Sequence, residues 1–128
     1  MISSSTVTTI LPVEDMERAT GFYRDRLGLE DGGDVGGGNH LLRTSAGSTI
    51  ELMTAEPGAQ TGHTVMSFEV DDVAREISDL ETRGVAFEDY DLPDLHTVDH
   101  VVTVGTDKAA WFKDSEGNVL CLHQRLSA

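Results

Sequence analysis

The stretch AWFKDSEGNVLCLHQ, from Ala110 to Gln124, predicts a β-hairpin. Its middle, Asp114 to Asn118, combines short polar side chains with a glycine, and tight turns use these residue types. After the turn, the side chains alternate between an aliphatic set and a set that contains Cys121 and His123. One face of this last strand must therefore be covered, and the other presents a thiol and an imidazole to whatever lies opposite.

The rest of the chain predicts the same order of elements twice: a strand, a helix and further strands. Apolar residues that alternate indicate strands, and apolar residues at helical spacing indicate the two helices. Asp15 and Asp72 stand where they can cap the helices, and Gly28 stands where the first helix should end. The expected strands are 7–13, 29–38 as a loose hairpin, 40–44, 48–53, 63–70, 85–91, 98–104, 108–113 and 119–123.

The two halves also resemble each other in sequence. VEDM at Val13 to Met16 matches VDDV at Val70 to Val73, and RLGL at Arg26 to Leu29 matches RGV at Arg83 to Val85. Internal repetition of this kind decides the fold class. We expect an α+β fold of two βαβββ modules, whose curved mixed sheets carry the helices outside and surround a cavity.

Length and charge limit the function. The 128 residues indicate one domain, with module one at about 5–54, a linker at 55–62 and module two at about 63–125. This acidic protein has 9 basic and 23 acidic residues, a net charge of −14, which makes nucleic acids and anionic membranes poor partners. A single cysteine, no long apolar run and no signal-peptide pattern predict a cytoplasmic location.

Three segments together resemble the vicinal oxygen chelate superfamily, the group of glyoxalase I, bleomycin-resistance proteins and extradiol dioxygenases. They are LPVEDMERATGFYRDRLGLE, SFEVDDVAREISDLETRGVAFE and AAWFKDSEGNVLCLHQ. The resemblance implies a pair of βαβββ modules with a small-molecule cavity between them, and a homodimer. These segments are specific for the fold and poor guides to the reaction, because this fold hosts many reactions.

The resemblance also implies four inward positions that hold a divalent metal in the enzymes of this group. Counted from the marker residues, they are Thr8, Glu51, Val65 and Cys121. Valine cannot bind a metal and a threonine hydroxyl is a poor ligand, so the usual metal is not expected. A displaced metal site built from Glu51, His63 and Cys121, with His123 as a further ligand, remains the alternative.

Several residues are candidates for lining the cavity. Cys121 has a functional interpretation as a reactive thiol and a structural one as a small buried hydrophobic residue. Glu51 is either a general base or ligand anchor, or a carboxylate that bonds water or Thr8. Trp111 can stack on a planar ligand or serve in packing.

The remaining candidates lie on the first and last strands of module two. Ser67 can form part of a polar wall beside His63 and Val65. His123 lies either at the mouth of the cavity or at a frayed end of the chain.

Three functions remain open. The first is a small-molecule binder of the resistance-protein type that uses no metal. The second is an enzyme, either a lyase, isomerase or dioxygenase with a shifted metal site, or a metal-free enzyme with Glu51 as the base. The third is a structural dimerisation domain whose cavity is filled by side chains.

Overall fold

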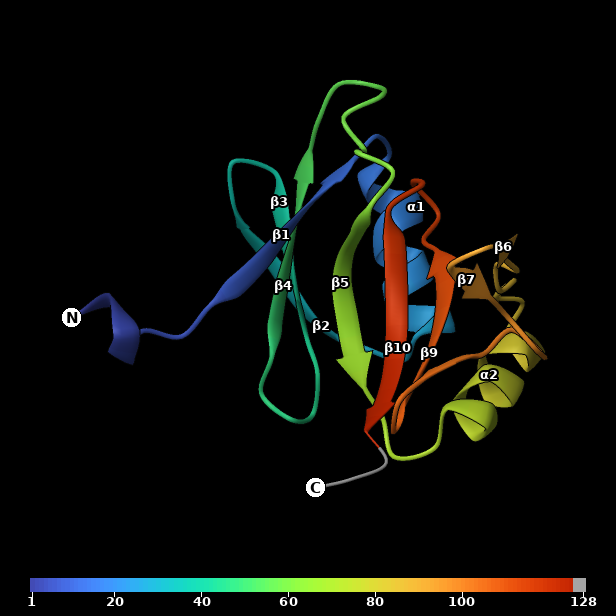
Figure 1. The fold of residues 1–128 in the computed structure, drawn as a ribbon. Coiled ribbons are helices and arrows are strands. Elements are labelled where there is room, and N and C mark those ends of the chain that lie inside the picture. Colours follow the sequence, from blue (N-terminus) through green and yellow to red (C-terminus); the bar gives the residue numbers. More distant parts are fainter. Residues whose placement is uncertain (126–128) are drawn as a thin grey trace. The chain divides into compact units, whose positions relative to one another are not determined.

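Each half of the chain folds into a four-stranded mixed sheet with one helix, as the computed structural model shows for residues 1–125 (Figure 1). The chain divides into two compact units, unit 1 from Met1 to Thr61 and unit 2 from Gly62 onward. The predicted α+β class, with repeated strand and helix order, is confirmed. The single domain and the cavity between the modules stay predictions.

Unit 1 has the strand order β1-β4-β3-β2, in which β1 and β4 are parallel and the other neighbours are antiparallel. A short 3-10 helix, η1, precedes the sheet, and a π-helical turn, η2, continues α1. The elements are η1 (Ile2–Ser4), β1 (Thr8–Val13), α1 (Met16–Gly21), η2 (Phe22–Arg26), β2 (Glu30–Gly36), β3 (Asn39–Arg43) and β4 (Thr49–Thr54).

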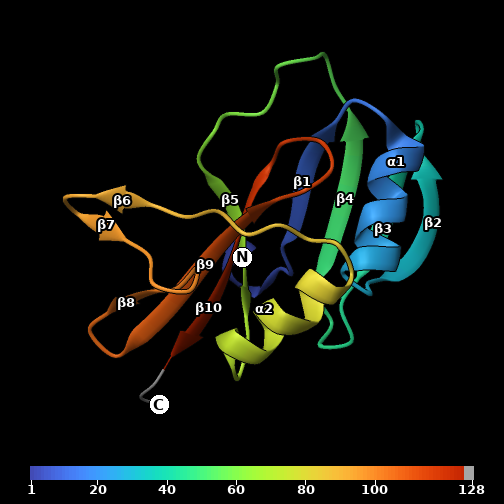
Figure 2. The same cartoon turned by 90° about the vertical axis from the view of Figure 1, so that its right-hand side faces the viewer.

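The core of unit 1 lies between α1 and one face of its sheet (Figure 2). Asp15 caps α1 as predicted, because its side chain accepts a hydrogen bond from the Arg18 backbone N–H at 3.0 Å. Tyr23 is fully buried, as are the sheet residues Leu11 and Leu52. Alternation along β1 and β4 leaves the other sheet face free of a helix within unit 1.

Unit 2 repeats this plan with the strand order β5-β10-β9-β8, in which β5 and β10 are parallel. A two-stranded hairpin, β6 and β7, is inserted between its helix and β8. The elements are β5 (Thr64–Glu69), α2 (Val73–Thr82), β6 (Asp91–Leu92), β7 (Leu95–His96), β8 (Val102–Val104), β9 (Asp107–Lys113) and β10 (Val119–Arg125).

Helix α2 covers one face of the unit 2 sheet. Its buried residues Val73, Ile77 and Leu80 follow helical spacing, as predicted. Asp72 caps the helix by accepting a hydrogen bond from the Arg75 N–H at 3.1 Å. The Gln124 side chain on β10 accepts another from the Val73 N–H at 2.8 Å, which ties the start of the helix to the sheet.

Two expected strands of unit 2 are largely absent. Residues 85–91 contribute one bridge, between Phe87 and Phe112, before β6 starts at Asp91. Residues 98–101 form a turn in which Asp99 and His100 have positive φ of 51° and 70°. This backbone resembles a type I′ turn and reverses the chain, so β8 begins only at Val102.

Within residues 1–125, no helix is long and apolar enough to cross a membrane.

Candidate functional site

The helix-free face of the unit 1 sheet carries a carboxylate among apolar residues. Glu51 on β4 lies opposite Ile10 on one neighbouring strand and Leu41 on the other. Its chain neighbours Ile50 and Leu52 are buried on the helix side, which places Glu51 on the open face. Ile10 is 52% exposed although it is a large apolar residue. This face therefore offers an apolar surface around one acidic group.

Glu51 is half-buried and is held by a neighbouring strand. Its Oε2 accepts a hydrogen bond from Asn39 Nδ2 at 2.9 Å. Thr8, which the sequence suggested as a partner, instead shares a hydrogen bond of 2.9 Å with the hydroxyl of Thr49. Within residues 1–125, Asn39 is the residue whose side chain bonds the Glu51 carboxylate, at Oε2. The other carboxylate oxygen of Glu51 can therefore accept a hydrogen bond from a ligand.

On the helix-free face of unit 2, Cys121 lies in the middle strand between Ser67 on β5 and Trp111 on β9. Its side chain is buried, with 6% exposure. Burial raises the pKa of the Cys121 thiol. This is the environment of a small apolar residue and disfavours the reactive thiolate.

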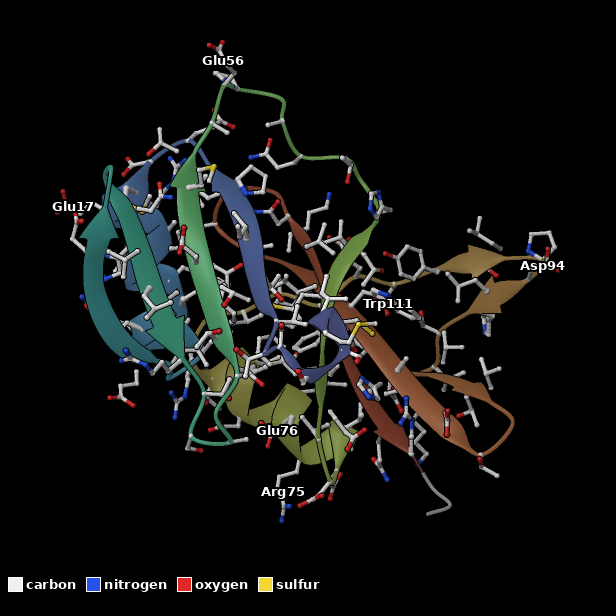
Figure 3. The ribbon with its side chains drawn as sticks, turned by 90° about the vertical axis from the view of Figure 1, so that its left-hand side faces the viewer. Glu17, Glu56, Arg75, Glu76, Asp94 and Trp111 are labelled. Carbon is white, nitrogen blue, oxygen red and sulfur yellow. The ribbon has the colours of Figure 1, made fainter. Side chains whose placement is uncertain are left out.

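Trp111 is held in place on the same face (Figure 3). Its Nε1–H donates a hydrogen bond to Thr64 Oγ1 at 3.0 Å. The Tyr90 ring meets the Trp111 ring edge-on at a centroid distance of 5.7 Å, and burial raises the pKa of the Tyr90 hydroxyl. Neither Thr64 nor Tyr90 was a candidate in the sequence, because their contacts depend on the pairing of strands far apart in the chain.

Three polar side chains form a hydrogen-bonded chain across β5 and β10. Ser67 Oγ lies 2.6 Å from His123 Nδ1, and Glu69 Oε1 lies 3.3 Å from His123 Nε2. An ionised carboxylate can only accept, so the imidazole proton belongs on Nε2. The neutral imidazole then accepts the Ser67 hydroxyl proton at Nδ1. From the sequence, Ser67 and His123 were separate candidates.

A bulge explains part of this arrangement. The pairing of β5 with β10 shifts by one residue between Val119 and Leu120, which leaves Val65 as the extra residue. The alternation expected along this strand is broken there, and Thr64 joins the face of Trp111. His63 is exposed and precedes β5, away from the paired part of the strand.

The residues at the four positions implied by the resemblance do not fit a divalent metal. Val65 has no donor atom, and Cys121 is buried with its pKa raised. Thr8 and Glu51 each already bond a side chain of a neighbouring strand. Within residues 1–125, no group of three His, Cys, Asp or Glu side chains is arranged to hold a metal ion. Hard cations need several oxygen or nitrogen donors converging on one point.

Solved structures share the fold of this chain. A superfamily member from Sphaerobacter thermophilus is 21% identical with a TM-score of 0.75, covering 98% of this chain and 100% of its own. A point mutant of the fosfomycin resistance protein FosX of Listeria monocytogenes, in complex with Mn(II) and 1S,2S-dihydroxypropylphosphonic acid, is 19% identical with a TM-score of 0.68, covering 96% and 90%. TnmS3, an antibiotic binding protein from a Streptomyces species, is 24% identical with a TM-score of 0.67, covering 95% and 98%.

At these identities the likeness concerns the fold alone. A comparison with curated proteins gave no match. A family model described as "Glyoxalase/Bleomycin resistance protein/Dioxygenase superfamily" matches residues 5–122, nearly the whole chain. The resemblance inferred from the three sequence segments is confirmed, and the chain belongs to the glyoxalase, bleomycin resistance protein and dioxygenase superfamily.

Proposed function

We propose that this chain binds a small organic molecule on the helix-free faces of its sheets, without the divalent metal of the superfamily enzymes. The observation that carries the proposal is the surface around Glu51. Ile10 and Met53 are 52% and 40% exposed on the same face as this half-buried carboxylate. Exposed apolar side chains beside an oriented polar group are typical of ligand sites.

Trp111, on the helix-free face of unit 2, offers a separate stacking surface for a planar ligand. Its ring is fixed by Thr64 and Tyr90, so little rotamer freedom is lost when a planar molecule stacks on it. For the unit 1 face we propose a largely apolar ligand with a hydrogen-bond donor for Glu51, and for the unit 2 face a planar ligand that stacks on Trp111. The antibiotic-binding protein of the same fold makes such a role compatible with this architecture.

The chain contains one tryptophan, so fluorescence reports directly on Trp111. We would titrate the protein with a panel of planar aromatic antibiotics and follow quenching. Replacing Glu51→Gln should weaken binding on the unit 1 face, and Trp111→Phe, followed by calorimetry, should weaken stacking on the unit 2 face. Glu17→Gln, on the exposed surface of α1 (Figure 3), is the matched control and should bind like the wild type.

Metal content is measured separately on the same preparation. After incubation with Mn(II) and buffer exchange, elemental analysis should find far less than one ion per chain. A tightly bound divalent ion at about one per chain would reject the metal-free proposal. Unchanged affinity in both Glu51→Gln and Trp111→Phe would reject the proposed binding faces.

A second candidate is a metal-free enzyme in which Glu51 is the general base. The hydrogen bond from Asn39 orients the carboxylate and leaves one oxygen for a substrate proton. Glu51→Gln should then abolish turnover of a ligand found in the binding panel without unfolding the protein. Asn39→Ala should lower turnover less, because it removes only the orienting donor.

We also propose a cytoplasmic homodimer. The apolar residue Val7, just before β1, is 84% exposed, and dimerisation would bury it. A chain with one cysteine gains no internal disulfide from an oxidising compartment. Analytical ultracentrifugation should show a dimer, and Val7→Asp should shift it toward the monomer. A monomer at all concentrations would contradict this part of the proposal.

A further inference from the structure

An open hollow in unit 2 brings the Ser67 and His123 side chains to one place. It has a volume of about 360 Å³ and is bounded by β5, β8, β9 and β10. Its walls are partly apolar, with Val102 and Val104, and partly charged, with Asp107 and Arg125 beside Ser67 and His123. A volume in this range accommodates a small organic molecule.

The hydrogen-bonded chain at this hollow has the order of a nucleophile, a base and an orienting acid. The Ser67 hydroxyl is exposed and bonds an imidazole nitrogen at 2.6 Å. Glu69 bonds the other nitrogen at 3.3 Å, and Arg125 Nη1 lies 3.5 Å from the same carboxylate oxygen. Because a carboxylate accepts from Nε2–H, the tautomer that suits both contacts of the imidazole leaves Nδ1 free to accept from Ser67.

We propose that Ser67, His123 and Glu69 form a catalytic centre for acyl transfer from small esters. Such centres are recognised by the geometry and roles of their side chains, and they recur on unrelated folds. Ser67 and His123 are the catalytic residues, and Glu69 is a positioning residue.

The reaction balances with water as the only co-reactant. Ser67 Oγ bonds the ester carbonyl carbon while its proton passes to His123 Nδ1. The bond from this carbon to the leaving alcohol oxygen breaks, and that oxygen takes the proton. Water then attacks the acyl-serine and gives a proton to Nδ1. The acid leaves, and the proton returns to Ser67 Oγ.

This activity goes beyond ligand binding at Glu51 and Trp111 and is tested by different measurements. The first probe is 4-nitrophenyl acetate, whose hydrolysis releases a coloured phenolate. The second is a fluorophosphonate, which labels activated serines and is located by peptide mass spectrometry. We expect the label on Ser67. Surface imidazoles also cleave activated esters slowly, so the site of the label decides the assignment.

Variants separate catalysis from a structural role of the same hydrogen bonds. Ser67→Ala and His123→Gln should abolish labelling and reduce hydrolysis to that of the buffer. The matched control is Ser48→Ala, which removes a serine of the β3–β4 turn in unit 1 and should leave both signals unchanged. Circular dichroism and thermal unfolding show whether each variant is folded.

Glu69→Gln tests the positioning role. An amide can donate to Nε2 and so favours the tautomer that places a proton on Nδ1, facing Ser67. We expect kcat for the ester to fall on the order of tenfold or more with little change in KM. Equal hydrolysis by wild type and Ser67→Ala, or no label on Ser67, would overturn the proposal. If Ser67→Ala unfolds, an unlabelled Ser67 in the folded wild type still overturns it.

Discussion

The Asp114 carboxylate and Asn118 bond each other across the turn that joins β9 to β10. Asp114 Oδ1 accepts the Asn118 backbone N–H at 2.8 Å, and Oδ2 accepts the Asn118 side-chain amide at 2.9 Å. The same Oδ1 accepts the Glu116 N–H at 2.9 Å. Gly117, with φ of 90°, supplies the positive backbone angle that the turn requires. These hydrogen bonds fix the geometry of the turn, and with it the hairpin that carries Cys121 and His123.

Replacing Asp114→Ala should destabilise the protein by at least about 2 kcal/mol, because buried donors lose their acceptor. Asp114→Asn keeps one oxygen for the backbone groups but turns an amide toward the Asn118 amide, so we expect about 1 kcal/mol. Asp94→Ala at the exposed tip of the β6–β7 hairpin (Figure 3) is the control. Urea unfolding measures all three. Equal effects of Asp114→Ala and Asp94→Ala would show that the carboxylate does not organise the turn.

The hydrogen bond between Trp111 and Thr64 should be measurable as a coupling energy. Trp111→Phe removes the donor and Thr64→Val removes the acceptor, and each keeps much of the original shape. A double-mutant cycle in urea should give about 0.5–1.5 kcal/mol between the two sites, the range of one net hydrogen bond. Strictly additive single effects would mean that the indole is held by packing against Tyr90 alone.

Cys121 should react with iodoacetamide far more slowly in the native protein than in concentrated urea. Burial both hides the sulfur and raises its pKa, so less thiolate forms at mildly alkaline pH. The native rate should be lower by on the order of a hundredfold or more, because reaction needs an opening of the unit 2 sheet. Rapid labelling of the folded protein would instead identify an accessible thiol.

The raised pKa of Cys121 also makes the free energy of unfolding depend on pH. The folded thiol stays neutral to higher pH than the unfolded thiol. The stabilising contribution of the neutral thiol is therefore complete below the ordinary thiol pKa. It is lost as pH rises through the raised pKa of the thiol in the folded protein. We expect Cys121→Ser to flatten the fall of the unfolding free energy at alkaline pH. An unchanged alkaline slope in this variant would contradict that link.

Acid should loosen the β2–β3 hairpin near its open end, where Asp31 bonds Gly33 and His40. The pKa of Asp31 is lowered, first by the hydrogen bond from the Gly33 N–H at 2.9 Å and then by His40. The stabilising effect is present above the unfolded pKa of the carboxyl and is lost as pH falls through its lowered folded value. NMR should show the Gly33 amide signal shifting in this acidic range. The shift should vanish in Asp31→Asn.

Much of the fold could be predicted because its signals are local. Asp15 and Asp72 cap helices through bonds that span three residues, and the Asp114 turn closes within five. The strand expected at 98–104 was partly wrong for a different reason, since only Val102–Val104 form it. Asp99 and His100 adopt positive φ without being glycines, which alternation of apolar residues cannot indicate.

The site was only partly predictable. The sequence singled out the Glu51 carboxylate, but its partner Asn39 lies on another strand whose register the sequence leaves open. Val65 was placed at a ligand position by counting along a regular strand, and the bulge there changes which neighbours share its face.

The repeated βαβββ pattern, the capped helices and the final hairpin were determined by the sequence itself. Periodicity and turn chemistry are properties of neighbours in the chain. Only the tertiary structure decided that Ser67, Glu69 and His123 meet, although the histidine lies far along the chain from the other two. Their contact depends on the parallel pairing of β5 with β10 and on one extra residue at Val65. A register change of a single residue would turn these side chains to opposite faces of the sheet, and no local signal sets that register.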